Sequence, residues 1–417
     1  MSFKFDLRVN SFQQIISYLP YNFSSELQIK NKKILKSLHN NKSSIEVSLS
    51  QIASIQGHKE PIYSLLIISE YILTGSADCS IIVRKRIGVN KQDKQDKQII
   101  HTFNDHKGTV YCMLKLDEFD EANKNIFASG SGDETIKIFD LKQKKCINTL
   151  KGHNDFIIKI FNIKNMENSL HNSSNSSDSN KSLILSSSAD KTLKLWSIQG
   201  EMLKNYNYGE EIFSIAHLNL SNSSSKNLSN NLFAIGDHEY KINIFDLDKN
   251  KSLIQLEEHD LWVNNIIFDE YIMGYPALFS GGADNKIIIW NLNTFLKESI
   301  LEGHDEPVYG LLCLKFKGLK LLISGSEDGV INVWNLEISS CIYSYEKNEE
   351  VVLSIMVNQK YTPYNNEKTD IKELDNDFNK EIGKEICGET YTNVYIEEEL
   401  ELIFGTGNKD LLVLNMI

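Results

Sequence analysis

Short apolar segments alternate with polar turns along this chain, and one arrangement of them recurs. Its clearest copy covers residues 323–336, ISGSEDGVINVWNL. Residues 323–326 are small or apolar, residues 327–329 have the composition of a tight turn, and residues 330–334 alternate apolar and polar side chains. Because successive side chains of a strand point to opposite faces, this pattern predicts two strands joined by a turn.

The same arrangement occurs at residues 74–84, 129–139, 186–196 and 280–290. In every copy an Asp is followed six residues later by a large side chain. These pairs are Asp78/Arg84, Asp133/Phe139, Asp190/Trp196, Asp284/Trp290 and Asp328/Trp334. A His lies upstream of each Asp, at the end of a run such as LKGH or LEGH. These residues are His58, His106, His153, His259 and His304.

On these motifs the chain resembles the WD-repeat family of β-propellers, whose repeats are roughly 40–45 residues long. The resemblance covers about residues 50–417. Two weaker units complete the series. In residues 233–246 Glu239 replaces the Asp, and no His precedes it. In residues 404–415 Asn408 and Leu414 stand at the Asp and Trp positions. Seven units imply an all-β, seven-bladed propeller.

The predicted organisation is a helical N-terminal extension at residues 1–45 and a propeller at residues 46–417. The chain provides three strands for the last unit, so we expect residues 51–56 to add its outer strand and close the ring. Insertions fall between the first and second strands of several units, all on one face of the ring. Those at residues 164–181, 220–231 and 359–394 are too polar to build a core, and we expect them to be disordered.

The N-terminal extension contains Ile15–Pro20, IISYLP, which resembles the core of an F-box. An F-box joined to WD repeats implies a substrate receptor of a cullin ubiquitin ligase, with an adaptor bound at residues 6–40. The upstream Pro and downstream Trp of that family are absent here. Three alternatives are a hairpin packed on the ring, a docking segment for another partner, and a basic amphipathic helix on a membrane surface.

Charge and cysteine content limit the kinds of function and compartment that the sequence allows. The net charge of −12 argues against a nucleic-acid binder. The six cysteines form no CxxC pair, and the sequence shows no signal peptide or membrane-length apolar run. We therefore expect a protein of the cytoplasm, with the nucleus left open, that works as a monomer within a complex. The predicted function is that of a non-enzymatic scaffold that binds peptides or protein surfaces. A constitutive structural subunit of a large complex is one alternative to it.

His, Ser, Asp and Trp recur together and mimic a hydrolase triad, but a set repeated around a ring serves a fold better than an active site. The resemblance implies a structural network that ties loops to turns. Its expected members are His58, Ser76, Asp78, His106, Ser131, Asp133, His153, Ser188, Asp190, Trp196, His259, Asp284, Trp290, His304, Ser326, Asp328 and Trp334. We predict no catalytic residue, no metal site and no cofactor, and an ion pair between Asp78 and Arg84.

The face with the short turns is the predicted binding surface, and the family's contact positions map onto it. The expected partner-binding residues are Glu60, Tyr63, Tyr111, Phe156, Phe213, His238, Trp262, Tyr309 and Glu327. This rim is aromatic and acidic, with almost no Lys or Arg, so it suits basic or Lys/Arg-containing peptides of protein partners. It suits phosphopeptides badly, because phosphate capture needs an Arg cluster. We expect neither a nucleic-acid nor a membrane partner. The alternative is that the Tyr side chains pack flat between units and bind nothing.

Overall fold

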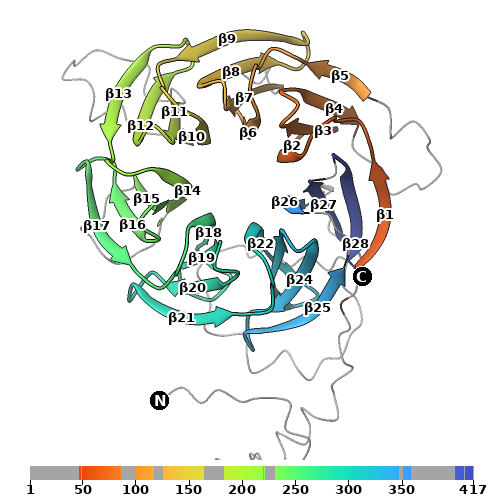
Figure 1. Cartoon of the computed structure of the whole chain (residues 1–417), viewed down its shortest axis with the longest axis vertical. Helices are drawn as coiled ribbons and strands as arrows, with labels where there is room; N and C mark the ends of the chain where they lie inside the picture. The colour runs from red at the N-terminus through yellow and green to blue at the C-terminus, as the bar shows by residue number, and fades with distance from the viewer. Residues whose placement is uncertain are drawn as a thin grey trace, which may run out of the picture.

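The computed structural model describes residues 47, 49–85, 99–116, 125–163, 183–218, 220, 231–346, 351–357, 400–407 and 409–416. Within these ranges the chain forms seven four-stranded antiparallel sheets. The sheets are blades around a central channel, with the first strand of each blade at the channel (Figure 1). The predicted all-β, seven-bladed propeller is therefore confirmed.

Six blades use strands consecutive in the chain. Blade one has β2 (Ile62–Ile68), β3 (Tyr71–Ser76), β4 (Ile81–Lys85) and β5 (Ile99–Phe103). Blade two has β6 (Val110–Lys115), β7 (Ile126–Ser131), β8 (Thr135–Asp140) and β9 (Lys145–Lys151), and blade three has β10 (Ile157–Ile163), β11 (Leu183–Ser188), β12 (Thr192–Ser197) and β13 (Met202–Asn207). Blade four has β14 (Ile212–Leu218), β15 (Leu232–Asp237), β16 (Ile242–Asp246) and β17 (Lys251–Leu256). Blade five has β18 (Val263–Asp269), β19 (Ala277–Gly282), β20 (Ile287–Asn291) and β21 (Leu296–Leu301), and blade six has β22 (Val308–Phe316), β23 (Leu319–Ser326), β24 (Val330–Asn335) and β25 (Ser340–Glu346).

Blade seven joins the two ends of the described chain. It contains β26 (Val352–Val357), β27 (Leu400–Thr406) and β28 (Leu411–Met416), and its outer strand is β1 (Leu49–Ile55). β1 pairs antiparallel with β28, and the Ser54 hydroxyl donates to the Asp410 carboxylate at 2.6 Å. This pairing covers the edge that β28 would otherwise expose. The outer strand starts two residues before the predicted residue 51 and ends at Ile55.

The blades pack against one another through apolar side chains on both faces of their sheets. Between blades two and three, for example, Ile138 of β8 packs in one cluster with Ile160 and Trp196. The blades approach so closely that a Cβ on Gly130 would lie 2.5 Å from Ile157 of the next blade. The inner strands are therefore rich in small residues where neighbouring blades meet.

Several predictions fall on residues outside the described ranges. These are the helical extension and F-box hairpin within residues 1–45, and the insertions 164–181 and 359–394 with residues 221–230. They stay predictions from the sequence. In the described part of the chain no helix is long and apolar enough to cross a membrane.

Candidate protein-binding face

In five blades a buried His joins the loop before the first strand to the turn after the second strand. The bonds from His Nδ1 to Asp Oδ2 are His58–Asp78 at 3.0 Å, His106–Asp133 at 2.8 Å, His153–Asp190 at 2.7 Å, His259–Asp284 at 2.9 Å and His304–Asp328 at 3.0 Å. Each Asp also accepts a bond from the backbone N–H of the residue after the His. We call each such set a loop clamp, and the face on which the clamps lie the short-turn face.

The hydroxyl bonded to the other side of the His ring belongs to a residue that the sequence analysis did not name. Nε2 of His153 lies 2.7 Å from Oγ of Ser186, not of Ser188. The Trp196 indole N–H donates to the same hydroxyl at 2.7 Å. The missed residues are Thr74, Ser129, Ser186, Ser280 and Ser324. A hydroxyl residue ten positions before each Trp was the signal that could have found them.

The predicted serines serve the turn instead. Ser188 accepts a bond from the Asp190 backbone N–H and donates to the Asp155 carbonyl at 3.0 Å. Three more occupy the equivalent place and donate to the corresponding loop carbonyl: Ser76, Ser131 and Ser326. The turn is therefore fixed from two sides, by a carboxylate and by a hydroxyl.

The titration behaviour of the clamps fits a structural role. Burial opposes ionisation of Asp78, but the hydrogen bonds from Ser80 and from the Lys59 backbone outweigh it and lower the pKa to about 2. Burial lowers the pKa of His58 and of His153. A neutral imidazole thus faces a carboxylate, while the hydroxyls of the set are fully buried, as at Ser186. A nucleophile needs access to substrate, which this hydroxyl lacks.

Blade four contains a clamp built from other residues. The sequence pattern assigned Glu239 to the Asp position, but the carboxylate in use belongs to Asp237. Tyr208 takes the place of the His, and its hydroxyl donates to Asp237 Oδ2 at 2.8 Å. The Asn243 amide donates to the same oxygen at 2.6 Å. The pattern missed this set because the carboxylate lies two residues earlier than expected.

Blade one departs at the Trp position. Arg84 fills that position at 2% exposure, and its Nη2 donates to the Gln56 carbonyl at 2.7 Å. The predicted ion pair with Asp78 is wrong, since the ion pairs among described residues do not include one between these two. Nε and Nη1 of Arg84 are buried and find no hydrogen-bond partner in the described structure. Blade one therefore contains a buried cation that is only partly satisfied.

Each first strand contains a bulge at its second residue, where it leaves the short-turn face. A bulge turns its side chain away from the regular alternation. The seven bulge residues, which we call the mouth ring, all line the channel. They are Tyr63, Tyr111, Ile158, Phe213, Asn264, Tyr309 and Leu353. The residue that follows each of them forms a second, deeper ring: Ser64, Cys112, Lys159, Ser214, Asn265, Gly310 and Ser354.

Aromatic side chains of this face gather in two clusters. In one, Tyr63 meets Tyr111 edge-on at 5.3 Å between ring centroids, and Tyr111 lies 5.9 Å from Phe156. In the other, Phe213 stacks on Trp262 at 5.4 Å and on His238 at 6.4 Å, and His238 and Trp262 are also in contact at 6.5 Å. Phe156 and Trp262 remain 47% and 42% exposed. The rings therefore pack on one another and still present apolar surface to a partner.

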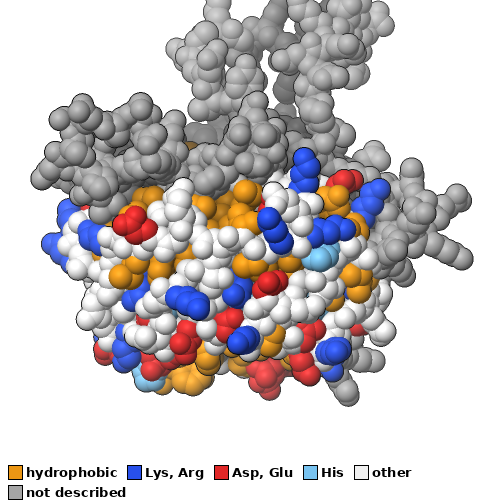
Figure 2. All heavy atoms as spheres, turned by 90° about the horizontal axis from the view of Figure 1, so that it is seen from above, with side chains coloured by type: hydrophobic (Ala, Val, Ile, Leu, Met, Phe, Trp, Pro, Cys, Tyr) orange, Lys and Arg blue, Asp and Glu red, His pale blue; other side chains and the backbone are white. Residues whose placement is uncertain are grey.

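Charge on the face is more mixed than the sequence suggested. Exposed acids include Glu60, Glu306 and Glu327, but Lys59 and Lys107 follow the clamp histidines and are exposed as well. The expectation of almost no Lys on the rim is wrong at these positions. In the side view of Figure 2, red acidic and orange hydrophobic side chains lie side by side along the lower edge of the ring.

The most distinct acidic site lies at blade six. The Tyr309 hydroxyl donates to Glu327 Oε2 at 3.3 Å. Burial and Glu327 raise the pKa of Tyr309 to about 12. The pKa of Tyr63 is also raised, by burial, Tyr111 and Glu327, which places Tyr63 within electrostatic reach of this carboxylate. Two phenol rings and a carboxylate thus share one sector of the mouth.

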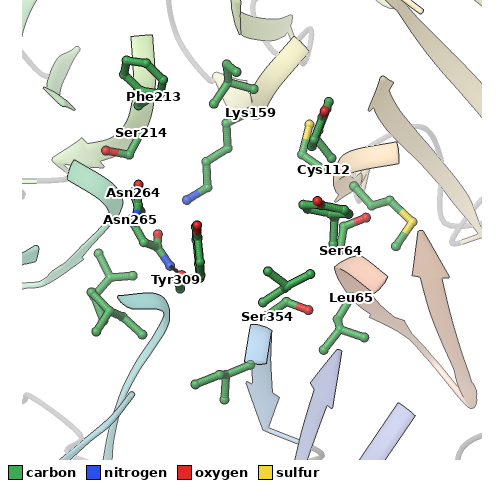
Figure 3. A pocket seen from close by; sticks show the side chains of 18 of the residues that line it. Ser64, Leu65, Cys112, Lys159, Phe213, Ser214, Asn264, Asn265, Tyr309 and Ser354 are labelled. Carbon is green, nitrogen blue, oxygen red and sulfur yellow. Dashed lines mark hydrogen bonds between the residues drawn. The ribbon is translucent and has the colours of Figure 1, made fainter. Parts of the chain in front are cut away.

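Behind the mouth ring the channel opens into a cavity of about 470 Å³ (Figure 3). Its wall combines apolar side chains with hydroxyl, amide and phenol groups from the two rings. Across the described ranges, no group of three or more His, Cys, Asp or Glu side chains is placed to hold a metal ion. The channel is therefore a recess that could receive a side chain of a partner.

Four segments of the chain match a known repeat family. The family model described as "WD domain, G-beta repeat" matches residues 49–84, 97–140, 144–197 and 296–335. These segments contain the complete loop clamps of blades one, two, three and six. The match includes neither blade four, where Tyr208 and Asp237 replace the usual residues, nor the His259–Asp284 clamp of blade five.

The proteins whose sequences are similar to this chain carry names from different areas of cell biology. The chain is 25% identical over 270 residues to the U3 small nucleolar RNA-associated protein 15 homolog of Xenopus tropicalis, covering 64% of this chain and 46% of that protein. It is 24% identical over 313 residues to cell division control protein 4 of Saccharomyces cerevisiae (74% and 32%) and 24% identical over 323 residues to human striatin (73% and 39%). The chain thus matches less than half the length of these relatives.

Proposed function

From the premise that this chain belongs to the WD40-repeat family of β-propellers, we propose that its short-turn face binds Lys- or Arg-containing segments of protein partners. Propellers of this family are generally protein-interaction scaffolds and are usually non-catalytic. The ring would hold its partners without altering them. Fold alone does not select a partner, so the proposal depends on the residues of the face.

The observation that carries the proposal is the sector formed by Tyr63, Tyr309 and Glu327. A cationic side chain above a phenol ring gains cation–π attraction, and a neighbouring carboxylate adds a charge-assisted hydrogen bond. Glu327 already receives the Tyr309 hydroxyl, so its position is fixed before a ligand arrives. The exposed rings of Phe156 and Trp262 would bind apolar residues of the same segment.

The test is peptide selection on the full chain. A phage-displayed library of random linear peptides is selected on the wild-type protein, and the recovered peptides are synthesised and measured by calorimetry. We expect Lys or Arg enrichment. The double variant Glu306→Lys/Glu327→Lys should bind these peptides at least about tenfold more weakly, because it replaces attraction by repulsion.

The matched control is Glu298→Lys/Glu346→Lys, which makes the same change of charge on the outer strands β21 and β25. It should bind like the wild type. Equal losses in both variants would mean that only net charge matters. Peptides without basic residues, or full binding by the Glu306→Lys/Glu327→Lys protein, would overturn the proposal.

A further inference from the structure

The second ring of the channel is neutral and small except at one position. Ser64, Ser214 and Asn265 each donate a side-chain hydrogen bond to a first-strand carbonyl of the next blade, at 3.0, 2.5 and 2.8 Å. These polar groups are therefore used in holding adjacent blades together. They leave little polar capacity for a ligand.

Lys159 breaks this pattern in blade three. Its backbone pairs with Ser187 of β11, whereas most other second-ring residues face a Gly of the neighbouring strand. Its side chain extends into the cavity, with the ammonium group directed across it (Figure 3). Among the described residues that line the cavity it is the one charged side chain. Within the described part of the chain, its ammonium makes no hydrogen bond and no ion pair.

The neighbours of Lys159 supply no compensating charge. Burial raises the pKa of the Cys112 thiol to about 12, so this neighbour stays neutral. The phenol of Tyr309 likewise stays neutral, with its pKa raised to about 12 by burial and Glu327. Burial in turn lowers the pKa of Lys159, although Cys112 opposes this slightly. An ammonium without a counter-charge in a recess lined otherwise by neutral side chains is costly, so an arriving anion would relieve an existing penalty.

We propose that Lys159 is the anchor for an Asp or Glu side chain that a bound peptide inserts into the channel. The inference rests on the proposed peptide-binding function of the short-turn face and adds a second specificity to it. Asn264 of the mouth ring lies on the side to which the ammonium points (Figure 3). Its Nδ2 is buried and has no partner in the described structure, so a rotation of this amide towards the channel would bring an unused donor to the second carboxylate oxygen.

The charges around the mouth favour a carboxylate on a peptide over a free inorganic anion. Glu60, Glu306 and Glu327 lie at the rim, and they would repel an anion that arrives alone. A peptide that offers a basic residue to the Tyr63–Tyr309–Glu327 sector and an acidic residue to Lys159 satisfies both. Lys159 projects from blade three, whereas the basic-residue sector projects from blades one and six, so the two sites take their side chains from different blades (Figure 1). A ligand of this kind is held in one orientation.

The experiment compares peptides selected from the same random phage library on the full chain and on its Lys159→Met variant, which keeps an unbranched side chain one atom shorter and removes the charge. Wild-type peptides should share one acidic position. A synthetic peptide with that residue should bind the variant about tenfold more weakly. Replacing the acidic residue of the peptide by its amide should weaken binding to the wild type by the same factor. It should not weaken binding to Lys159→Met any further, which is the non-additivity that a direct contact gives in a double-mutant cycle.

Two further proteins keep the test decisive. Lys315→Met, an exposed Lys on β22, is the matched control and should bind like the wild type. Lys159→Glu should select peptides with a basic residue at the position that was acidic, provided that it melts as one cooperative unit. Basic peptides without an acidic position, bound equally by Lys159→Met, would overturn the anchor and leave the rim function intact. Failure of the wild type to select any peptide would overturn both.

Discussion

Blades three and four perform the same structural task with different side chains. In blade three, His153 and Asp190 connect the incoming loop to the turn. The other ring nitrogen of His153 bonds the Ser186 hydroxyl, which also accepts a bond from Trp196. In blade four, Tyr208 and Asp237 make the connection, supported by Asn243. Both place a carboxylate between loop and turn, in a partly buried site.

The difference teaches which part of the repeat the fold requires. A His can bond two groups at once through its two nitrogens, so blade three links a carboxylate and a hydroxyl through one ring. Tyr208 has one hydroxyl, and Asn243 donates both to it and to Asp237, at 2.6 Å each. Both blades thus keep a charged acceptor between loop and turn, while the side chains that donate to it differ.

The largest expected effect comes from removing each carboxylate. Asp190→Ala and Asp237→Ala should each lower the free energy of unfolding by about 2–3 kcal/mol, because each leaves buried donors without an acceptor. Glu239→Ala should change it by less than about 0.5 kcal/mol, since its side chain forms a surface ion pair with Lys241. Urea titration followed by tryptophan fluorescence measures all three.

This series decides between the two assignments of blade four. If Glu239→Ala were as destabilising as Asp190→Ala, and Asp237→Ala were mild, the residue six positions before Phe245 would be the carboxylate that matters. The structure favours the opposite result.

The repeat pattern predicted the ring, its seven blades and the His–Asp contacts, because those features are spaced regularly along the chain. It did not predict Ser186, although the hydroxyl residue ten positions before the Trp was a usable signal. It could not predict Asp237, because the carboxylate of blade four lies two residues earlier than the pattern expects. It also missed the isolation of Lys159. The charge of that residue matters only because seven strands from distant parts of the sequence surround one channel. Spacing identifies repeated roles, whereas a site between blades needs the three-dimensional arrangement.

Blade one offers a second contrast with blade three. Arg84→Trp should raise the free energy of unfolding by about 1–2 kcal/mol, because it removes a buried guanidinium with unpaired Nε and Nη1. The new indole could donate to Thr74, which occupies the position of Ser186. Arg84→Met is the control that removes the charge without a new donor, and it should stabilise less. A loss of stability in both variants would show that the Gln56 contact of Arg84 outweighs its burial.

A smaller effect separates two tyrosines of the same segment. Tyr208→Phe should cost about 1 kcal/mol, because Asp237 loses one of its donors. Tyr206→Phe is the matched control: the Tyr206 hydroxyl is buried and has no partner among described residues, so its removal should be neutral or slightly stabilising. Thermal unfolding of the two variants side by side measures the difference. Equal costs would mean that the Tyr208 hydroxyl contributes nothing specific to blade four.

The finest contrast between blades three and four lies in their response to pH. Burial lowers the pKa of His153 below its usual 6.5 in the folded protein, so its contribution to stability is present above pH 6.5 and is lost as the pH falls further. Burial and Asp237 raise the pKa of Tyr208 above its usual 10, so its contribution is present below pH 10 and is lost as the pH rises further. Blade three should therefore weaken in acid and blade four in alkali.

Urea titrations across this pH range test the contrast, with a single group contributing at most about 1.4 kcal/mol per pH unit. His153→Gln should be less stable at neutral pH and should lose stability less steeply below pH 6.5 than the wild type. Tyr208→Phe should keep the acid response and show a flatter decline above pH 10. Each variant is the control for the other, since each removes one clamp donor. An unchanged acid slope in His153→Gln would mean that His153 is not buried as a neutral ring, and the difference in chemistry between the two blades would then have no consequence for their titration.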